Sequence, residues 1–153
     1  MKKIIKVVFS ISFIFYILAL VFLMFLGRGG VFANLSLLEY IRVSSNIVPF
    51  KTISTYVQAI FDGSMNRDIP IKNLAGNLLM FLPMGIYLPF FIKRISKVSV
   101  FITSMIAILF SLEFIQVISR RGSFDIDDFI LNILGALIGF CIWRTRIVQK
   151  ILN

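Results

Sequence analysis

Long runs of apolar residues, separated by polar segments, dominate the pattern of this chain. The first run, Ile4 to Leu26, holds 23 residues without a charge, and only Ser10 and Ser12 interrupt it. About 20 predominantly apolar residues are enough for a helix to cross the hydrocarbon of a bilayer. The run therefore predicts a membrane-spanning helix over residues 4–26.

Two further runs are long enough to span a membrane. The second covers residues 73–92 and is interrupted by Asn77, Pro83 and Gly85. The pairing of Pro83 with Gly85 indicates a kink. The third run covers residues 98–119. Each of the two predicts a spanning helix.

The last apolar run is shorter than a spanning helix needs. Phe129 to Trp143 has 15 residues, which is about 22 Å at the helical rise, against a hydrocarbon thickness of about 30 Å. The helix is therefore expected to begin near Asp127 or Asp128 and to draw polar residues toward the membrane. Together the runs predict an all-α integral membrane protein, a bundle of four transmembrane helices in a single domain (1–153), with spans at 4–26, 73–92, 98–119 and 128–143.

The segment between the first two spans, residues 27–72, is expected to form an external interfacial loop. It is too short to enclose a sizeable core of its own. Its middle, residues 35–61, mixes apolar side chains with scattered polar ones, which is typical of segments that lie on or dip into one leaflet. A turn at Asp62-Gly63 is expected to close it.

The N-terminal run also permits a second interpretation. Lys2, Lys3 and Lys6 resemble the positive start of a signal peptide, and residues 31–33 are compatible with a cleavage site. However, the run is long for the apolar core of a signal peptide, and residues 27–30 would end a helix naturally. We therefore favour a first helix that is retained.

Composition agrees with a lipid environment. Residues are 59% hydrophobic and only 15% charged, and the mean hydropathy is +0.97, which excludes an ordinary soluble domain. The 16 Lys and Arg exceed the 7 Asp and Glu, so the net charge is +9. These cations cluster beside the apolar runs rather than along one amphipathic face. We therefore expect no nucleic-acid partner.

The distribution of charge predicts an orientation. If the N-terminus lies in the cytoplasm, the cytoplasmic segments hold basic residues and no acidic one, as the positive-inside rule requires. These basic residues are Lys2, Lys3, Lys6, Lys93, Arg94, Lys97, Arg144, Arg146 and Lys150. Trp143 would then anchor the inner end of the last helix. We therefore expect both termini to lie inside the cell.

Two residue types limit the available chemistry. Cys141 is the single cysteine, so no internal disulfide can form. The chain has no histidine, which removes the commonest metal ligand and the usual base of a catalytic triad. We expect no metal and no cofactor. Any reaction would depend on carboxylates, amides, hydroxyls, Lys or Arg.

Polar residues within three of the spans form stripes near the external helix ends. The stripes are Asn73 and Asn77; Glu113, Gln116 and Arg120; and Asp128, Asn132, Gly135 and Gly139. Their spacings of three and four residues place each stripe on one helix face. Because a charge at mid-membrane costs at least about 2.5 kcal/mol, we expect the three stripes to face one another rather than the lipid.

These residues also have structural interpretations. Glu113 could pair with Arg120 or Arg121, although an ionisable residue inside a membrane favours a functional role. The amides could simply join helices by hydrogen bonds; they are Asn77, Gln116 and Asn132. Gly135 and Gly139 predict a close-packing face.

Three aspartates follow the third span. Asp125, Asp127 and Asp128 could be loop carboxylates and a helix N-cap, or they could bind an ion opposite Arg120 and Arg121. They would also suit a hard divalent cation, but nothing in their spacing fixes a ligand geometry.

Several of these residues fall in motifs that resemble one family. The motifs are Asn46-Ile47-Val48-Pro49-Phe50; Asn77-Leu78-Leu79-Met80-Phe81-Leu82-Pro83-Met84-Gly85; Ser111-Leu112-Glu113-Phe114-Ile115-Gln116; and Arg121 with Asp125-Ile126-Asp127-Asp128 ahead of Asn132 and Gly135. In order and spacing they resemble the successive blocks of the VanZ-like family. The resemblance implies a small bacterial envelope membrane protein, in a family whose named member lowers susceptibility to the lipoglycopeptide teicoplanin.

The resemblance and the polar stripes lead to one site hypothesis. We expect a cluster at outer-leaflet depth in the bacterial cytoplasmic membrane to bind a membrane lipid, a lipid-linked envelope precursor or a lipoglycopeptide. Its candidate ligand-binding residues are Asn77, Glu113, Gln116, Arg120, Arg121, Asp125, Asp127, Asp128 and Asn132. Such a site would lower susceptibility to lipoglycopeptides such as teicoplanin, and assembly into homo-oligomers is left open.

Two other functions stay open at this point. In a membrane-embedded enzyme acting on a lipid-linked envelope substrate, Glu113 or Asp128 would be the catalytic acid or base, and Arg121 would stabilise anionic charge. No nucleophile motif supports this role. In a structural or scaffolding protein, the polar stripes would only hold the bundle together.

Overall fold

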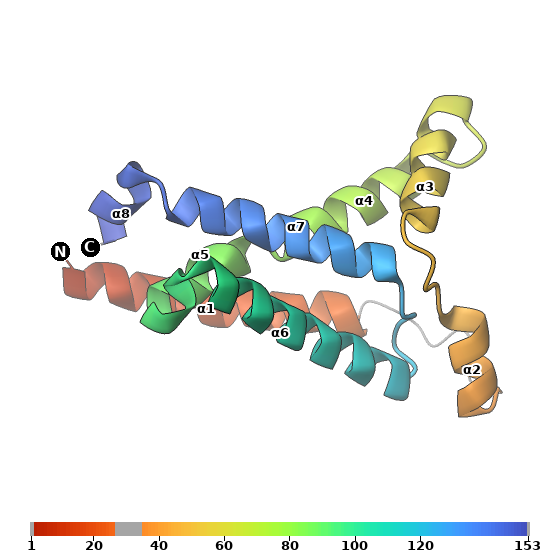
Figure 1. Cartoon of the computed structure of the whole chain (residues 1–153), viewed down its shortest axis with the longest axis horizontal. Helices are drawn as coiled ribbons and strands as arrows, with labels where there is room; N and C mark the ends of the chain where they lie inside the picture. The colour runs from red at the N-terminus through yellow and green to blue at the C-terminus, as the bar shows by residue number, and fades with distance from the viewer. Residues whose placement is uncertain (1, 27–34, 153) are drawn as a thin grey trace.

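The computed structural model describes residues 2–26 and 35–152, and within them every regular element is a helix (Figure 1). The elements are α1 (Lys2–Val21), the π-helical turn η1 (Phe22–Leu26), α2 (Leu37–Ser44), α3 (Lys51–Asp62), α4 (Asp68–Met80), α5 (Leu82–Phe91), the 3-10 turn η2 (Lys93–Ser96), α6 (Val98–Ile118), α7 (Ile126–Trp143) and α8 (Arg146–Leu152). The glycine-rich segment 27–30 and the candidate cleavage site at 31–33 lie outside the described residues.

Four helical stretches within the described residues are long and apolar enough to cross a membrane. They are Lys3–Leu26, Asp68–Phe91, Val98–Ile118 and Ile126–Trp143. The prediction of an all-α membrane protein with four spanning helices is therefore confirmed. The chain is a multi-pass membrane protein.

Two spans begin earlier than the apolar runs indicate. α4 starts at Asp68 rather than at residue 73; its N-cap, Arg67, has no side-chain cap, and the Asn66 side chain accepts the Asp68 N–H at 3.1 Å in the turn before it. The Asp125 carboxylate accepts the Asp127 N–H at 2.9 Å, and α7 starts at Ile126 rather than at residue 128. Side-chain acceptors of this kind satisfy amide groups that a helix leaves unpaired at its start.

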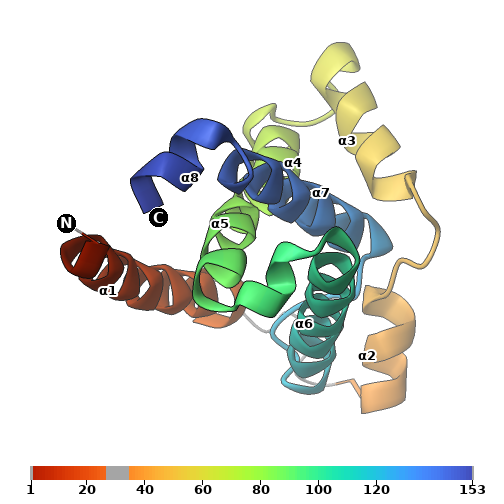
Figure 2. The same cartoon turned by 60° about the vertical axis from the view of Figure 1, so that its left-hand side comes forward.

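The two ends of the bundle differ. α1 starts and α8 ends at one end, whereas α2 and α3 lie at the other, which we call the loop end (Figures 1 and 2). Because both ends of the described chain lie at the same end of the bundle, the chain crosses the membrane an even number of times. Which end faces the outside of the cell stays a prediction.

The loop between the first two spans contains two short amphipathic helices. Ser36 and Glu39 form a reciprocal capping box at the start of α2. α3 ends at Asp62, and its C-cap Gly63 has a left-handed φ of 70°, so the predicted turn at Asp62-Gly63 is confirmed. Large apolar side chains such as Leu38 and Phe61 remain exposed on these helices, as segments that lie on a membrane require.

α7 is the central helix and packs against α4, α5 and α6. Its contact with α4 and α5 depends on glycine. A Cβ on Gly135 would collide with the Leu78 carbonyl oxygen, and one on Gly139 would collide with the Leu82 carbonyl oxygen. The predicted close-packing face is therefore present.

The second span is broken where Pro83 predicts a kink. α4 ends at Met80 and α5 begins at Leu82, because proline cannot donate the amide that a continuous helix needs. The Tyr16 hydroxyl of α1 donates to the Met80 carbonyl at 2.9 Å at this break. Gly85 has a different role from the one predicted: a Cβ there would collide with the Ala136 carbonyl oxygen, so Gly85 allows close packing.

Candidate functional site

Six of the nine predicted site residues are buried. Their side chains belong to α4, α6 and α7, and they are Asn77, Glu113, Gln116, Asp127, Asp128 and Asn132. None of them is more than 7% exposed, and Asp127 is fully buried. The polar stripes thus avoid the lipid, as the cost of exposing amides and carboxylates to hydrocarbon requires.

Asn77 and Asp128 join α4 to α7. The Asn77 Nδ2 donates to Asp128 Oδ1 at 2.5 Å, and it also lies 3.4 Å from Asn73 Oδ1, one turn away. One turn further along α7, the Asn132 Oδ1 is buried without a hydrogen-bond partner among the described residues. A buried carboxylate and an amide therefore meet at the contact between these helices, and a second buried amide lies one turn away on α7.

Gln116 makes the corresponding connection for α6. Its Nε2 donates to the Met24 carbonyl at 2.9 Å, in the π-helical turn that ends the first span. Glu113 lies one turn away on the same face and is 4% exposed. Gln116 thus acts as the interhelical contact that the structural interpretation described.

Asp127 stabilises the start of α3. Its Oδ1 accepts the Phe50 N–H at 2.5 Å, and its Oδ2 accepts the N–H groups of Thr52 at 2.7 Å and Ile53 at 3.1 Å. Phe50 has a left-handed φ of 64°, and α3 has no capping side chain of its own. Both oxygens of Asp127 are therefore used in holding the loop.

The Asp125 carboxylate also accepts hydrogen bonds from the 46–53 segment. Its Oδ1 accepts from the Asp127 N–H and from Asn46 Nδ2 at 3.1 Å, and its Oδ2 accepts from the Thr52 hydroxyl at 2.6 Å. The backbone of Asn46 also pairs with Phe124 and Ile126. Two motifs that lie far apart in the sequence, 46–50 and 125–128, thus form one hydrogen-bonded unit.

The two arginines of the predicted set lie in the turn after α6. Arg121 is exposed and makes no ion pair with a carboxylate of the described residues. Arg120 is half-buried and has a left-handed φ of 53°. The oxygens of Asp125 and Asp127 are occupied by the 46–53 segment, so the expected juxtaposition of aspartates and arginines does not describe these two carboxylates.

A cleft of about 420 Å³ opens beside the Asn77–Asp128 pair; we call it the α4 cleft. Its polar wall consists of Lys72, Asn73 and Asn77, and its apolar wall consists of Leu23, Leu79 and Met80, with Gly76 between them. Asn77 thus links the buried Asp128 to a surface that a ligand can reach. No group of three or more Asp, Glu or Cys side chains in the described part of the chain is placed to hold a metal ion.

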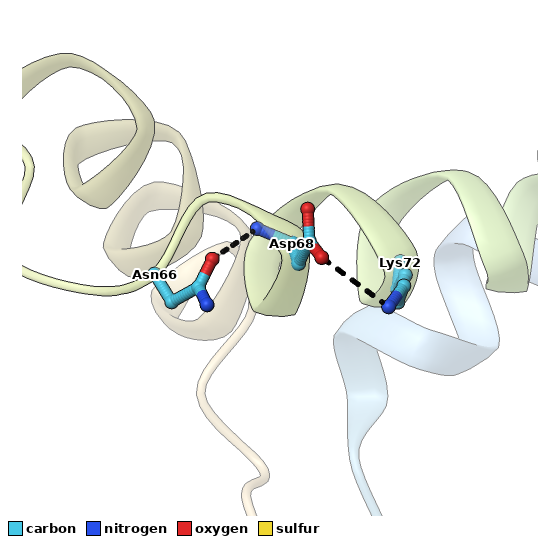
Figure 3. A network of polar contacts seen from close by, with 3 residues as sticks. All are labelled: Asn66, Asp68 and Lys72. Carbon is cyan, nitrogen blue, oxygen red and sulfur yellow. Dashed lines mark hydrogen bonds and ion pairs between the residues drawn. The ribbon is translucent and has the colours of Figure 1, made fainter.

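Lys72 was not among the predicted site residues. Its Nζ lies 3.5 Å from Asp68 Oδ2, and Figure 3 shows this pair at the start of α4, where the Asn66 side chain accepts the Asp68 N–H. Both side chains of the pair are more than 70% exposed, so the pair contributes little stability. The signal in the sequence was a cation directly before the second apolar run and five residues before Asn77.

Comparisons with known proteins give one match. A family model described as VanZ/LLP1 matches residues 13–149, a range that contains every motif and every candidate residue discussed above. Neither the curated proteins nor the solved structures gave a match.

Proposed function

Because the chain belongs to the VanZ/LLP1 family, we propose that it acts in the bacterial cell envelope. In this proposal the α4 cleft binds an amphiphilic envelope ligand at outer-leaflet depth, and binding lowers susceptibility to lipoglycopeptides such as teicoplanin. The ligand is a lipid-anchored wall precursor or the lipoglycopeptide itself. Both combine a polar group with a long apolar tail.

The observation that carries this proposal is that the cleft wall changes from polar at one end to apolar at the other. Lys72 and Asn73 lie at its polar end, and Met80 lies eight residues further along the chain, about 12 Å at the helical rise. A headgroup at Lys72 would therefore place its tail against Leu79 and Met80. A cleft with convergent polar groups and an apolar wall is the usual form of a small-molecule site.

The chemistry of the polar end suits phosphate and sugar. An ammonium group binds phosphate as a point charge, and the exposed pair of Lys72 with Asp68 is weak enough to be exchanged for one. Asn77 donates its Nδ2 to Asp128. The amide oxygen is then the group that it offers to a ligand hydroxyl.

Asp128 has a positioning role in this proposal. It is 7% exposed and holds the Asn77 amide from behind the cleft wall. Replacing it by alanine would remove the acceptor and leave Asn77 without this bond. The ligand would then lose an oriented polar contact, whereas the apolar wall would be unchanged.

The test fills the cleft without disturbing the helix contacts. Cells that produce wild type, Gly76→Phe, Gly76→Ala or Asp128→Ala are compared for susceptibility to teicoplanin and vancomycin, with membrane levels checked by blotting. Gly76 lines the cleft, and nothing lies within 4 Å of a Cβ built on it. Its alanine variant is therefore the matched control.

The proposal expects a teicoplanin-selective effect of wild type. Gly76→Ala should keep this effect, and Gly76→Phe and Asp128→Ala should lose most of it at equal protein levels. The proposal fails if wild type has no effect, or if Gly76→Phe protects as well as Gly76→Ala. A loss of effect that only follows a loss of protein would support a scaffolding role instead.

A further inference from the structure

A second pocket lies at the end of the bundle opposite the loop end, where α8 meets the turn between α5 and α6; we call it the α8 pocket. Its volume is about 280 Å³. Figures 1 and 2 both show α8 and this turn at the same end of the bundle. The α8 pocket shares no lining residue with the α4 cleft. Its lining includes Pro89 and Phe90 of α5, Lys93 and Ser96 of η2, Trp143 of α7 and Gln149 of α8.

The α8 pocket lies where three spans have their ends. The second span ends at Phe91, the third begins at Val98, and the fourth ends at Trp143. Every lining residue from α5, η2 and α7 is therefore within two residues of a span end. Spanning helices end near the boundary between hydrocarbon and water, where tryptophan is also enriched. The pocket is thus at the depth of lipid headgroups.

The charge around the pocket is positive. Lys93 lines it, is exposed, and makes no ion pair with a carboxylate of the described residues. Residues 69–112 and 129–153, which include every segment that forms the pocket, contain no Asp or Glu. The first acidic residue of α6 is Glu113, which lies about 22 Å along the helix from Val98. An anion is therefore the ligand that this charge attracts.

Two hydrogen bonds hold the pocket walls in place. The Ser96 hydroxyl donates to the Lys93 carbonyl at 2.6 Å within η2. The Gln149 side-chain amide donates to the Trp143 carbonyl at 2.7 Å and ties α8 to the end of α7. Because the Ser96 proton is used by the backbone, the Lys93 ammonium is the group in the lining that offers charge to a ligand. Phe90 adds an apolar side to the same pocket.

We propose that the α8 pocket binds the phosphate group of an anionic phospholipid headgroup, with the Lys93 ammonium as its counter-ion. Lysine binds phosphate as a point charge, and basic pockets between spanning helices take anionic headgroups. The position of the pocket at headgroup depth favours a lipid of the adjoining leaflet over a soluble phosphate compound. The proposal depends neither on the ligand of the α4 cleft nor on the side of the membrane that this end faces.

Trp143 can report occupancy directly, because it is the chain's only tryptophan. The purified protein is reconstituted in vesicles of phosphatidylcholine and phosphatidylglycerol in equal amounts, with bromine on the acyl chains of one lipid or of the other. Since bromine quenches tryptophan on contact and sits at the same depth in both lipids, a difference in quenching measures headgroup preference. We expect brominated phosphatidylglycerol to quench about five times as strongly, which corresponds to one lysine beside an anionic lipid.

Charge variants within η2 separate the pocket from a general attraction of anionic lipid. Lys93→Gln should remove the preference, and Lys93→Arg, which keeps the charge, should retain it. Arg94→Gln removes the same charge from a neighbour that does not line the pocket, and it should keep most of the preference. Equal quenching of wild type by both lipids would overturn the proposal. So would a preference that survives in Lys93→Gln, or one that Arg94→Gln removes as completely.

A soluble phosphate ester tests the source of the phosphate. Glycerol 3-phosphate is added to wild type and to Lys93→Gln in vesicles of phosphatidylcholine alone. We expect no saturable change in Trp143 emission up to millimolar concentrations, because the ester lacks the acyl chains that hold a headgroup at this depth. A saturable change that Lys93→Gln abolishes would overturn the lipid as the occupant.

Discussion

The carboxylate of Asp127 accepts the backbone N–H of Thr52 at 2.7 Å, so a side chain of α7 caps a helix that begins 76 positions earlier, at Lys51. The left-handed backbone of Phe50 directs further N–H groups toward the same carboxylate. This contact fixes the loop end of the bundle. It explains why two acidic residues of the predicted site, Asp125 and Asp127, serve the fold.

Replacing Asp127 should destabilise the protein. In Asp127→Ala three half-buried hydrogen bonds lose their acceptor, and a donor left unsatisfied costs about 1–3 kcal/mol when it is fully buried, so each loss should cost less than that upper value. We expect a lower free energy of unfolding, measured by circular dichroism in mixed detergent micelles. Asp68→Ala is the control, because Asp68 is 71% exposed and takes part only in a surface pair, and it should change stability by less than about 0.5 kcal/mol.

The sequence predicted the spans well because hydrocarbon imposes a simple rule on them. Any stretch that crosses the bilayer must be apolar and about 20 residues long, so residues 4–26 and 98–119 needed no knowledge of contacts. The start of the second span was predicted at residue 73 and lies at Asp68. Asp68 and Lys72 interrupt the uncharged run in the sequence although the helix continues through them, so hydropathy alone does not detect its start.

The site could be predicted only in part. Burial of Asn77 and Asp128 followed from helical spacing and the cost of polar groups in lipid. The different roles of Asp127 and Asp128 did not follow, because adjacent carboxylates look alike in sequence. Asp127 binds the 46–53 segment, whose position depends on the left-handed Phe50, whereas Asp128 binds Asn77. Lys72 was missed because its role depends on a cleft formed with Leu23 of another helix.

The glycines through which α7 contacts α4 and α5 should not tolerate a methyl group. In Gly135→Ala and Gly139→Ala the new Cβ would meet a backbone carbonyl oxygen of the facing segment, and overpacking of this kind costs about 1–3 kcal/mol. Gly76→Ala should be neutral or should stabilise by about 0.5–1 kcal/mol, because nothing lies within 4 Å of its Cβ. Thermal unfolding in micelles measures all three. Equal melting temperatures for Gly135→Ala and Gly76→Ala would contradict the close contact.

Asn77 and Asp128 should be energetically coupled. Their hydrogen bond is buried between α4 and α7, and polar pairs between membrane helices contribute about 0.6 kcal/mol on average and about 1.7 at most. A double-mutant cycle of Asn77→Ala and Asp128→Ala should give about 1 kcal/mol of coupling. Asp128→Ala combined with Ser12→Ala is the control, since Ser12 bonds Tyr87 on other helices. A coupling no larger than that of the control would show that the bond contributes nothing.

Glu39 should titrate at unusually low pH. Hydrogen bonds from the Ser36 hydroxyl and backbone N–H stabilise the ionised carboxylate and lower the pKa of Glu39. Because the pKa is lower in the folded protein, its stabilising contribution to α2 is present above the ordinary glutamate pKa and is lost as the pH falls through the lowered value. Carbon NMR of labelled glutamate in micelles should show the pKa of Glu39 rise in Ser36→Ala.

A matched group serves as the control for that titration. The pKa of Asp62 is also lowered, by hydrogen bonds from the backbone and hydroxyl of Ser64. Ser36→Ala should leave the Asp62 titration unchanged. If the pKa of Glu39 stays low without the Ser36 hydroxyl, the backbone N–H of residue 36 is the dominant donor.

The orientation of the bundle can be measured with single cysteines. In a Cys141→Ser background, Phe61→Cys places a thiol on α3 and Ile147→Cys places one on α8; the native side chains are 83% and 72% exposed. The positive-inside rule predicts that a membrane-impermeant maleimide labels residue 61 in intact cells and labels residue 147 only after permeabilisation.

The reverse pattern would have a wider consequence. The α4 cleft is lined mainly by residues of α4, which packs against α3, so inverted labelling would place the cleft at the cytoplasmic leaflet. A lipoglycopeptide that arrives from outside could not then reach it. Labelling therefore tests the proposed function directly.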